Sequence, residues 1–255
     1  MEELIIKEED YTITRRNTKT TFTIRFNSHN EALIRSFVKT NILLGTTISD
    51  HYKTVLFNAV TVKTLSQLSQ QQSKQSKQSP QTKKAVITYE TIGKMIFHLS
   101  SQLKYLIENY NMCFVGYSPD NIIIIDDTHF VYIPNTEQLC EIEDEHITIT
   151  YPFSPYDFYQ SPETYSIKEI PSKIHYKSIY YSLASLIVDY LYKNRHVYDE
   201  VEGEIVYSTT NDSTINSKIN PKTILEKLPI VGTKLYYLLK RCLVTEVKNR
   251  SLLYI

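Results

Sequence analysis

The chain has 255 residues, with 28 Lys and Arg against 28 Asp and Glu, and 42% of its residues are hydrophobic. This length can bury a substantial core, as one large domain or as two smaller lobes. The balanced charge argues against a nucleic-acid-binding protein, which usually carries a basic surface. The N-terminal residues are acidic, and no segment approaches the roughly 18 apolar residues of a membrane span. The sequence therefore predicts a soluble, intracellular protein.

Three further features of the composition narrow the class of protein. Only 5 residues are Gly, which leaves little for a glycine-rich phosphate-binding loop. The cysteines Cys113, Cys140 and Cys242 have no C-x-x-C spacing, so neither a disulfide framework nor a zinc site is predicted. The 21 Tyr, the absence of Trp and the frequent Ile, Lys and Asn suit an AT-rich genome, such as that of a large DNA virus or of some protists.

The first part of the chain is predicted to be mainly β-strand. Residues 11–14 and 20–26 are rich in β-branched and aromatic residues that alternate with others across a polar turn, which predicts a hairpin. Residues 30–38 carry apolar side chains at helical spacing, and residues 52–62 form another strand-like run. Residues 1–68 are therefore expected to form a small β-rich lobe with one helix.

The composition changes abruptly after this lobe. Residues 69–84 are rich in Gln, Ser and Lys and contain no large apolar side chain, so they are predicted to be a disordered linker. From residue 85 to 255 helical patterns prevail, with apolar stripes over 92–107, 180–191 and 235–243. Residues 112–133 interrupt them with a strand, a turn and a second pair of strands. This order predicts a two-lobed α+β protein with a mainly helical C-terminal lobe.

The order of these elements, with the motifs inside them, resembles the protein kinase superfamily. The most specific motif is FVGYSPDNII at residues 114–123, which resembles the catalytic loop H-R-D-L-K-P-E-N-I-L with Pro119, Asp120 and Asn121 in register. Weaker matches follow the family's order: residues 22–25 (V-A-I-K), 39–43 (H-P-N-I-L), 54–58 and 64–68 (around the hinge), 159–163 (Y-x-A-P-E), 181–184 (W-S-L-G) and 239–250 (the last helices). The resemblance spans residues 11–255 and implies a kinase-like fold with a reduced N-lobe.

The matched positions lack the groups that phosphoryl transfer requires, namely held phosphates, bound metal and an acid that orients the hydroxyl. The resemblance places Gly116 at the catalytic base, where no acceptor is present, and Asn135 at the metal-binding Asp of D-F-G. Asn121 is retained at a second metal-binding position. Residues 1–15 contain no Gly for a phosphate-binding loop. Neither ATP nor a metal ion is therefore expected as a cofactor.

Two pairs of charged residues complete what the resemblance implies. Arg25 takes the place of the third-strand Lys, and Glu31 is its only acidic candidate partner on the next helix. Glu163 and Arg250 match a Glu and an Arg that tie the activation segment to the helical lobe. We therefore expect Glu163 and Arg250 to form a buried ion pair, in a fold retained for its shape.

Simpler interpretations of several residues stay open. Asn121 can cap the turn after Pro119 instead of binding metal. Asp126 and Asp127 can form a solvated turn, and residues 141–146 can be a solvated acidic segment instead of a metal cluster. The tyrosines of residues 156–181 can mark a binding face or reflect base composition.

The expected function is that of a pseudokinase, a catalytically silent kinase-like protein that acts by protein–protein contact as a scaffold, decoy or allosteric regulator. Its expected partner is another protein, with a kinase or a kinase substrate among the candidates, in the cytoplasm or, for a viral protein, in the host cytoplasm or virion. One alternative is a divergent active Ser/Thr kinase that uses ATP and Mg²⁺ and recruits Glu137 or Asp126 for the metal. Another is a structural virion protein.

Overall fold

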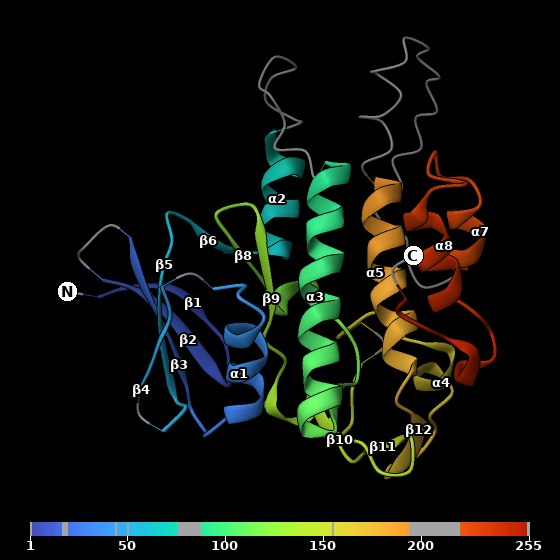
Figure 1. Cartoon of the computed structure of the whole chain (residues 1–255), viewed down its shortest axis with the longest axis horizontal. Helices are drawn as coiled ribbons and strands as arrows, with labels where there is room; N and C mark the ends of the chain where they lie inside the picture. The colour runs from blue at the N-terminus through green and yellow to red at the C-terminus, as the bar shows by residue number, and fades with distance from the viewer. Residues whose placement is uncertain are drawn as a thin grey trace.

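The computed structural model describes residues 2–16, 20–43, 45–49, 51–75, 88–154, 156–193 and 220–253. A β-sheet with one helix occupies one end of the molecule, and helices occupy the other (Figure 1). The predicted combination of antiparallel sheets near the N-terminus and helices later in the chain is confirmed.

The N-terminal sheet has five antiparallel strands. Its order is β1 (Glu3–Lys7), β2 (Tyr11–Arg15), β3 (Thr21–Phe26), β5 (Thr54–Asn58) and β4 (Thr47–Ser49). The predicted hairpin corresponds to β2 and β3, and the predicted helix is α1 (Glu31–Lys39), which buries Leu33, Ile34 and Phe37. The Asn30 side chain accepts a hydrogen bond from the Leu33 amide and so starts α1. The edge strands β1 and β4 were not predicted.

The chain between the two ends differs from the expected linker. Strand β6 (Val62–Thr64) pairs with a strand of the later part of the chain, and helix α2 (Leu65–Gln75) follows it directly. Thr64 and Gln67 exchange side-chain and backbone hydrogen bonds at 3.0 and 3.1 Å, which is a capping box, and Leu65 and Leu68 are buried.

Two predicted boundaries are therefore corrected. The N-terminal lobe does not run to residue 68, because residues 62–68 pair and pack with the later part of the chain. Residues 69–75, predicted to be linker, continue α2, since a capped and anchored helix extends through Gln, Ser and Lys at little cost per residue. The remainder of the predicted linker, residues 76–84, lies outside the described residues.

Helix α3 (Tyr89–Tyr110) crosses the middle of the molecule beside a three-stranded sheet (Figure 1). That sheet has the order β6, β8 (Ile122–Ile125) and β9 (His129–Tyr132). The buried Gln102 of α3 bonds both the amide and the carbonyl of Tyr132, at 2.9 and 2.7 Å, and so fixes β9 against the helix. The strands and helix predicted between residues 92 and 133 are confirmed.

The remaining described residues are mostly helical, and three short strands among them, β10, β11 and β12, were not predicted from the sequence. Strand β7 (Met112–Phe114) pairs with β10 (Leu139–Glu141), and β11 (His146–Ile149) pairs with β12 (Ser172–His175). The helices are α4 (Pro162–Tyr165), α5 (Ser178–Lys193), α7 (Pro221–Leu225) and α8 (Lys234–Cys242), with the single turns η1 (Pro119–Asn121), η2 (Thr136–Gln138) and η3 (Val247–Asn249).

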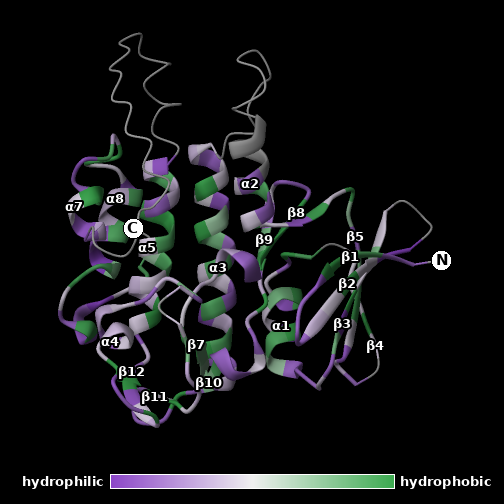
Figure 2. Cartoon of the chain, turned by 180° about the vertical axis from the view of Figure 1, so that it is seen from behind, coloured by the Kyte–Doolittle hydropathy of each residue, from purple (hydrophilic) through white to green (hydrophobic). Residues whose placement is uncertain are grey.

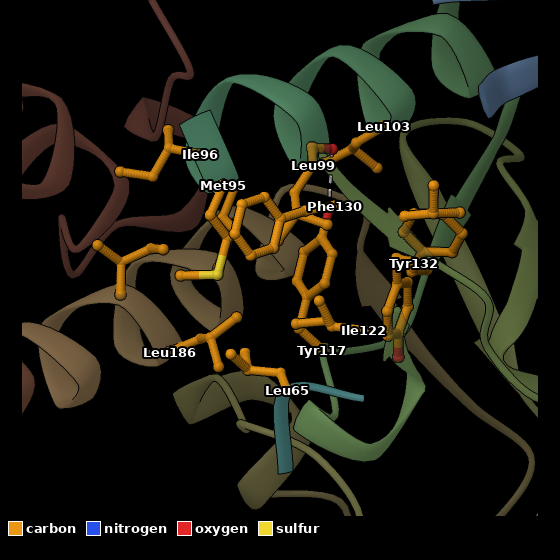
Figure 3. Packing of buried hydrophobic residues seen from close by; sticks show 14 of the residues in the cluster. Leu65, Met95, Ile96, Leu99, Leu103, Tyr117, Ile122, Phe130, Tyr132 and Leu186 are labelled. Atoms are coloured by element: carbon orange, nitrogen blue, oxygen red, sulfur yellow. Dashed lines mark hydrogen bonds between the residues drawn. The ribbon is translucent and has the colours of Figure 1, made fainter. Parts of the chain in front are cut away.

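The hydrophobic core runs through both ends of the molecule. Helix α5 is buried from Ser178 to Leu191, and it packs with α3, α7 and α8. Hydrophobic residues gather on the strands and on the inner sides of the helices (Figure 2). Figure 3 shows α3 residues Met95, Leu99 and Leu103 packed with Tyr117, Ile122 and Tyr132 of the following segment. Among the described residues, no helix is both long enough and apolar enough to cross a membrane.

Candidate functional site

The segment that resembles a catalytic loop connects β7 to β8. Residues 113–118 are all buried. The turn that the sequence predicted after them is η1. The Tyr117 amide donates to the Ser182 hydroxyl of α5 at 2.9 Å, and the Tyr117 hydroxyl reaches the Leu99 carbonyl of α3 (Figure 3). The loop is thus held by helices on two sides.

Tyr132 is fully buried beside this loop, and its hydroxyl bonds the backbone of the loop. Its hydroxyl donates to the Gly116 carbonyl at 2.6 Å and accepts from the Ser118 amide at 3.3 Å. Burial raises the pKa of Tyr132, although the Ser118 amide and the Asn121 side chain oppose the shift by hydrogen bonding to its oxygen. The hydroxyl therefore stays protonated and acts as a structural donor to the loop.

Gly116, aligned with the catalytic base, is packed directly against an aromatic ring. A Cβ atom built on Gly116 would lie 2.0 Å from Cδ2 of Phe158, a distance that real contacts do not reach. Phe158 is 4% exposed and packs on Phe153, with ring centroids 5.1 Å apart. No side chain fits at residue 116 unless Phe158 moves.

Asn121 is the last residue of the turn η1, and its contacts lie inside the protein. Its backbone amide bonds the Ser118 carbonyl, its carbonyl accepts from the Ile133 amide, and its side chain bonds the Tyr132 hydroxyl. The residue is 6% exposed. Its side-chain amide is therefore engaged inside the protein.

Asn135, aligned with the metal-binding Asp, begins the turn η2 without a side-chain capping bond. Instead, Asp10 from the turn between β1 and β2 accepts a hydrogen bond from the Thr136 amide at 2.7 Å. The β1–β2 turn occupies the place of the glycine-rich loop in the resemblance. Through this bond it contacts the Asn135 segment directly.

The β1–β2 turn is acidic as well as free of Gly. It contains Glu8, Glu9 and Asp10, and its backbone closes tightly through a bond between the Glu8 amide and the Tyr11 carbonyl. Partial burial and the negative charge of Asp120 raise the pKa of Glu8. Tyr11 beside it is fully buried, and its hydroxyl has no hydrogen-bond partner among the described residues. A phosphate group at this place would meet carboxylates instead of backbone amides.

Arg25 and Glu31 do not pair, which corrects the expected partner of Arg25. Alternation along β3 places Arg25 on the opposite face from the buried Ile24 and Phe26. Its guanidinium lies 3.1 Å from Glu2, just before β1, whereas Glu31 pairs with Arg35 one helical turn away at 2.7 Å. Within the expected set of Arg25, Glu31, Asn121 and Asn135, the first two residues therefore have other partners than each other.

Glu163 and Arg250 lie together, 87 residues apart in sequence. The two guanidinium nitrogens of Arg250 donate to the two carboxylate oxygens of Glu163 at 2.7 and 2.8 Å. Ser161 and Thr164 form a capping box that starts α4 and so positions Glu163.

The surroundings of Arg250 complete its hydrogen bonding. Arg250 is fully buried, lies over the ring of Tyr181, and also donates to the carbonyls of Val244 and Thr245. Burial favours a raised pKa for Glu163, but the bonds and the charge of Arg250 outweigh it and hold the pKa below its ordinary value.

The other candidate groups have structural environments. Asp126 accepts from the amides of Val60 and Thr61, and Asp127 pairs with Lys63, so these two residues are more than a solvated turn. Across the described ranges, no three His, Cys, Asp or Glu residues are placed to hold a metal ion, the 141–146 segment included. Burial raises the pKa of the Cys113 thiol, and that of Cys242 to about 12.

Sequence reasoning missed the residues that close this region. Phe158, Tyr132 and Asp10 each act through a partner that is distant in the chain. The aromatic run of residues 151–159 was visible, but no local pattern indicated which ring packs on Gly116. Nothing in the spacing of Asp10 and Thr136, 126 residues apart, indicated their contact.

No protein-family model matches the chain, and no curated protein matches it. The resemblance to protein kinases therefore depends on the motifs of this sequence.

Proposed function

We propose that this chain is a protein-kinase-like protein that transfers no phosphate and acts by binding another protein. The motif resemblance supports the kinase-like part of this proposal. The order of elements agrees with it: a five-stranded sheet with one helix, a connecting strand, then helices around a loop between β7 and β8.

The packing of Phe158 on Gly116 supports the claim that the protein transfers no phosphate. An acid that orients a hydroxyl must present its carboxylate beside the reacting groups. Here the aligned residue has no side chain, and an aromatic ring occupies the space that a side chain would fill. A substitution back to Asp would therefore need a second change at Phe158.

The residues at the expected phosphate-binding and metal-binding positions also support the absence of phosphoryl transfer. Asp10 bonds the Thr136 amide beside Asn135, and the acidic β1–β2 turn repels the phosphates that a glycine-rich loop binds. The active-kinase alternative needs Glu137 or Asp126 as a metal ligand. Asp126 is already engaged by the amides of Val60 and Thr61.

The part that binds a partner rests on what the fold retains. Glu163 and Arg250 keep a buried bidentate pair, and Tyr159 bonds Asp189 of α5 beside it. These bonds fix residues 159–163 on the helical part of the molecule. A segment that is held in place but surrounds no catalytic group suits a rigid binding surface.

Nucleotide binding and phosphoryl transfer test this proposal directly. Purified protein is heated with and without 1 mM ATP, each with and without Mg²⁺ or Mn²⁺, and transfer of labelled phosphate to itself and to generic substrates is measured. A ligand at 100 times its Kd stabilises a protein by about 2.7 kcal/mol, so a site with a Kd near 10 µM gives a clear shift. We expect no metal-dependent shift and no transfer.

Two Asn variants separate real activity from contamination. N121A removes the aligned metal ligand, and N109A changes an exposed Asn on α3 that lies away from the loop. Transfer that persists in N109A but is lost in N121A would overturn the proposal. Transfer of equal size in all three proteins identifies a contaminating kinase, because Asn121 cannot be dispensable for activity at this site.

A further inference from the structure

The charges of this neutral chain are segregated along the sequence. Between Lys104 and Lys168 there is no Lys or Arg, but there are eleven Asp and Glu residues. Residues 220–253 instead contain seven Lys and Arg and only two Glu. The zero net charge therefore conceals an acidic region and a basic region.

The acidic region projects from the molecule at the turn between β10 and β11. Glu141, Glu143, Asp144 and Glu145 are all exposed. Among the described residues the first three have no ion pair, and Glu145 lies 3.9 Å from His175. The neighbouring Lys177 donates to the Lys248 carbonyl. We refer to residues 141–145 as the acidic turn.

The basic region exposes one side of α8. Lys234, Tyr237 and Lys240 recur every three residues on this side, while Leu235, Leu238 and Leu239 are buried on the other. Tyr237 is 51% exposed, and neither lysine has an acidic partner in the part of the chain that is described.

Leu253 extends this surface beside the helix. It is 65% exposed, and its carbonyl is bonded by Arg241 of α8. We refer to Lys234, Tyr237, Lys240, Arg241 and Leu253 as the α8 face. The face combines cations with an aromatic and an aliphatic side chain, as protein interfaces do.

We propose that the α8 face of one copy of this chain binds the acidic turn of a second copy. The two surfaces have complementary charge. Among the described residues, Glu141, Glu143 and Asp144 have no cationic partner, and Lys234 and Lys240 have no acidic partner, so these groups break no ion pair when the surfaces meet. Figure 1 shows α8 at one end of the molecule and the β10–β11 region along its lower edge. The two surfaces are different parts of the chain, so the contact between copies is heterologous.

A heterologous contact builds a ring or an open chain instead of a closed two-fold dimer. The neutral net charge favours such assembly, because copies of the chain do not repel each other overall. This inference is independent of the proposed function, since none of its residues belongs to the region around Gly116.

Salt-dependent self-association tests the inference. The mass of the full chain is measured by sedimentation and light scattering over a range of protein concentrations, in 50 mM and in 500 mM NaCl. The Debye length falls from about 10 Å at 0.1 M salt to about 3 Å at 1 M, so exposed charge pairs weaken strongly. We expect the average mass to rise with concentration in 50 mM NaCl and to stay at the monomer value in 500 mM NaCl.

Charge reversal identifies the surfaces. K234E/K240E reverses the α8 face, and E141K/E143K reverses the acidic turn while avoiding Asp144 and Glu145, whose positive φ angles disfavour most substitutions. Each variant alone should remain monomeric in 50 mM NaCl, with a melting temperature near that of the native chain. An equimolar mixture of the two should associate, because each then supplies the surface that the other lacks.

The control K39E/K53E makes the same change of net charge on exposed residues elsewhere. It should associate as the native chain does. A native chain that stays monomeric in 50 mM NaCl would overturn the inference, and so would a mixture that remains monomeric. Equal loss of association in K39E/K53E would also overturn it, because net charge and not the α8 face would then control assembly.

Discussion

Replacing Glu163 with Ala should strongly destabilise the protein, because it leaves the guanidinium of a fully buried Arg250 without its counter-charge. Arg250 loses both carboxylate bonds, of 2.7 and 2.8 Å. It keeps bonds to the Val244 and Thr245 carbonyls at 2.8 and 3.3 Å. Removing one partner of a buried pair costs about 3–5 kcal/mol. Because Arg250 keeps two hydrogen bonds, we expect E163A to lower the free energy of unfolding by about 3 kcal/mol.

Replacing Arg250 with Ala should cost a similar amount for a different reason. The Glu163 side chain is 22% exposed, so water can partly solvate its charge. However, Arg250 is among the largest fully buried side chains, and its removal leaves a cavity beside Tyr181. In the double variant no unpaired charge remains, so its cost should be smaller than the sum of the two single costs by at least about 1 kcal/mol.

Urea unfolding of the native chain, both single variants and the double variant measures these free energies. A loss of about 3 kcal/mol corresponds to a fall in melting temperature of about 6–12 °C for a chain of this size. E169A, which removes an exposed Glu six residues further along, is the matched control and should change stability by less than about 0.5 kcal/mol. Two costs below about 1 kcal/mol that add without coupling would refute the reasoning, since they would describe a solvent-screened surface pair.

The same pair gives a pH dependence with a defined sign. The pKa of Glu163 lies below its ordinary value of 4.5 in the folded protein. A depressed carboxyl pKa stabilises the fold at pH values above the unfolded pKa, and this contribution disappears as pH falls through the folded pKa. The stability difference between the native chain and E163Q should therefore be constant near neutral pH and shrink below about pH 4.5. A difference that grows as the pH falls would contradict this assignment.

Three other predictions follow from contacts distant in sequence. G116A should lower the free energy of unfolding in urea by about 1–3 kcal/mol, because its methyl group meets the Phe158 ring. The cost should be smaller when the substitution is made in an F158A background, and an unchanged cost would exclude the ring as its cause. D10A should speed hydrogen exchange of the Thr136 amide without unfolding the sheet, whereas unchanged exchange would show that this bond contributes nothing. Replacing residues 76–84 with a short Gly/Ser linker should leave the melting temperature nearly unchanged. A replacement that starts at residue 69 should lower the melting temperature, because it truncates α2. Equal effects of the two replacements would place the stabilising contacts elsewhere.

The sequence alone determined the elements whose patterns are local. The β2–β3 hairpin follows from alternation, the helices α1, α3, α5 and α8 follow from helical spacing of apolar residues, and the strands β7 to β9 follow from short apolar runs beside turns. All of these patterns depend only on near neighbours. The helices α1, α3 and α8 bury the apolar stripe that their pattern predicted, whereas α5 is buried on all sides. The pairing of Glu163 with Arg250 was reached differently, through motif positions 87 residues apart, and the structure contains that bond.

Tertiary structure alone decided the remaining elements and the state of the candidate site. Strands β1, β4, β10, β11 and β12 were not predicted from the sequence, and each pairs with a partner strand beside it. Helix α2 continues through a polar sequence because its first turn is capped and anchored in the core.

The candidate site depends on the same distant contacts. Arg25 pairs with Glu2 and not with Glu31, because the pleat of β3 places its side chain on the opposite face from Ile24. The sequence showed that Gly116 has no carboxylate. Only packing between distant segments could decide that the ring of Phe158 fills the space beside it, because which side chain reaches that space depends on the path of the whole chain.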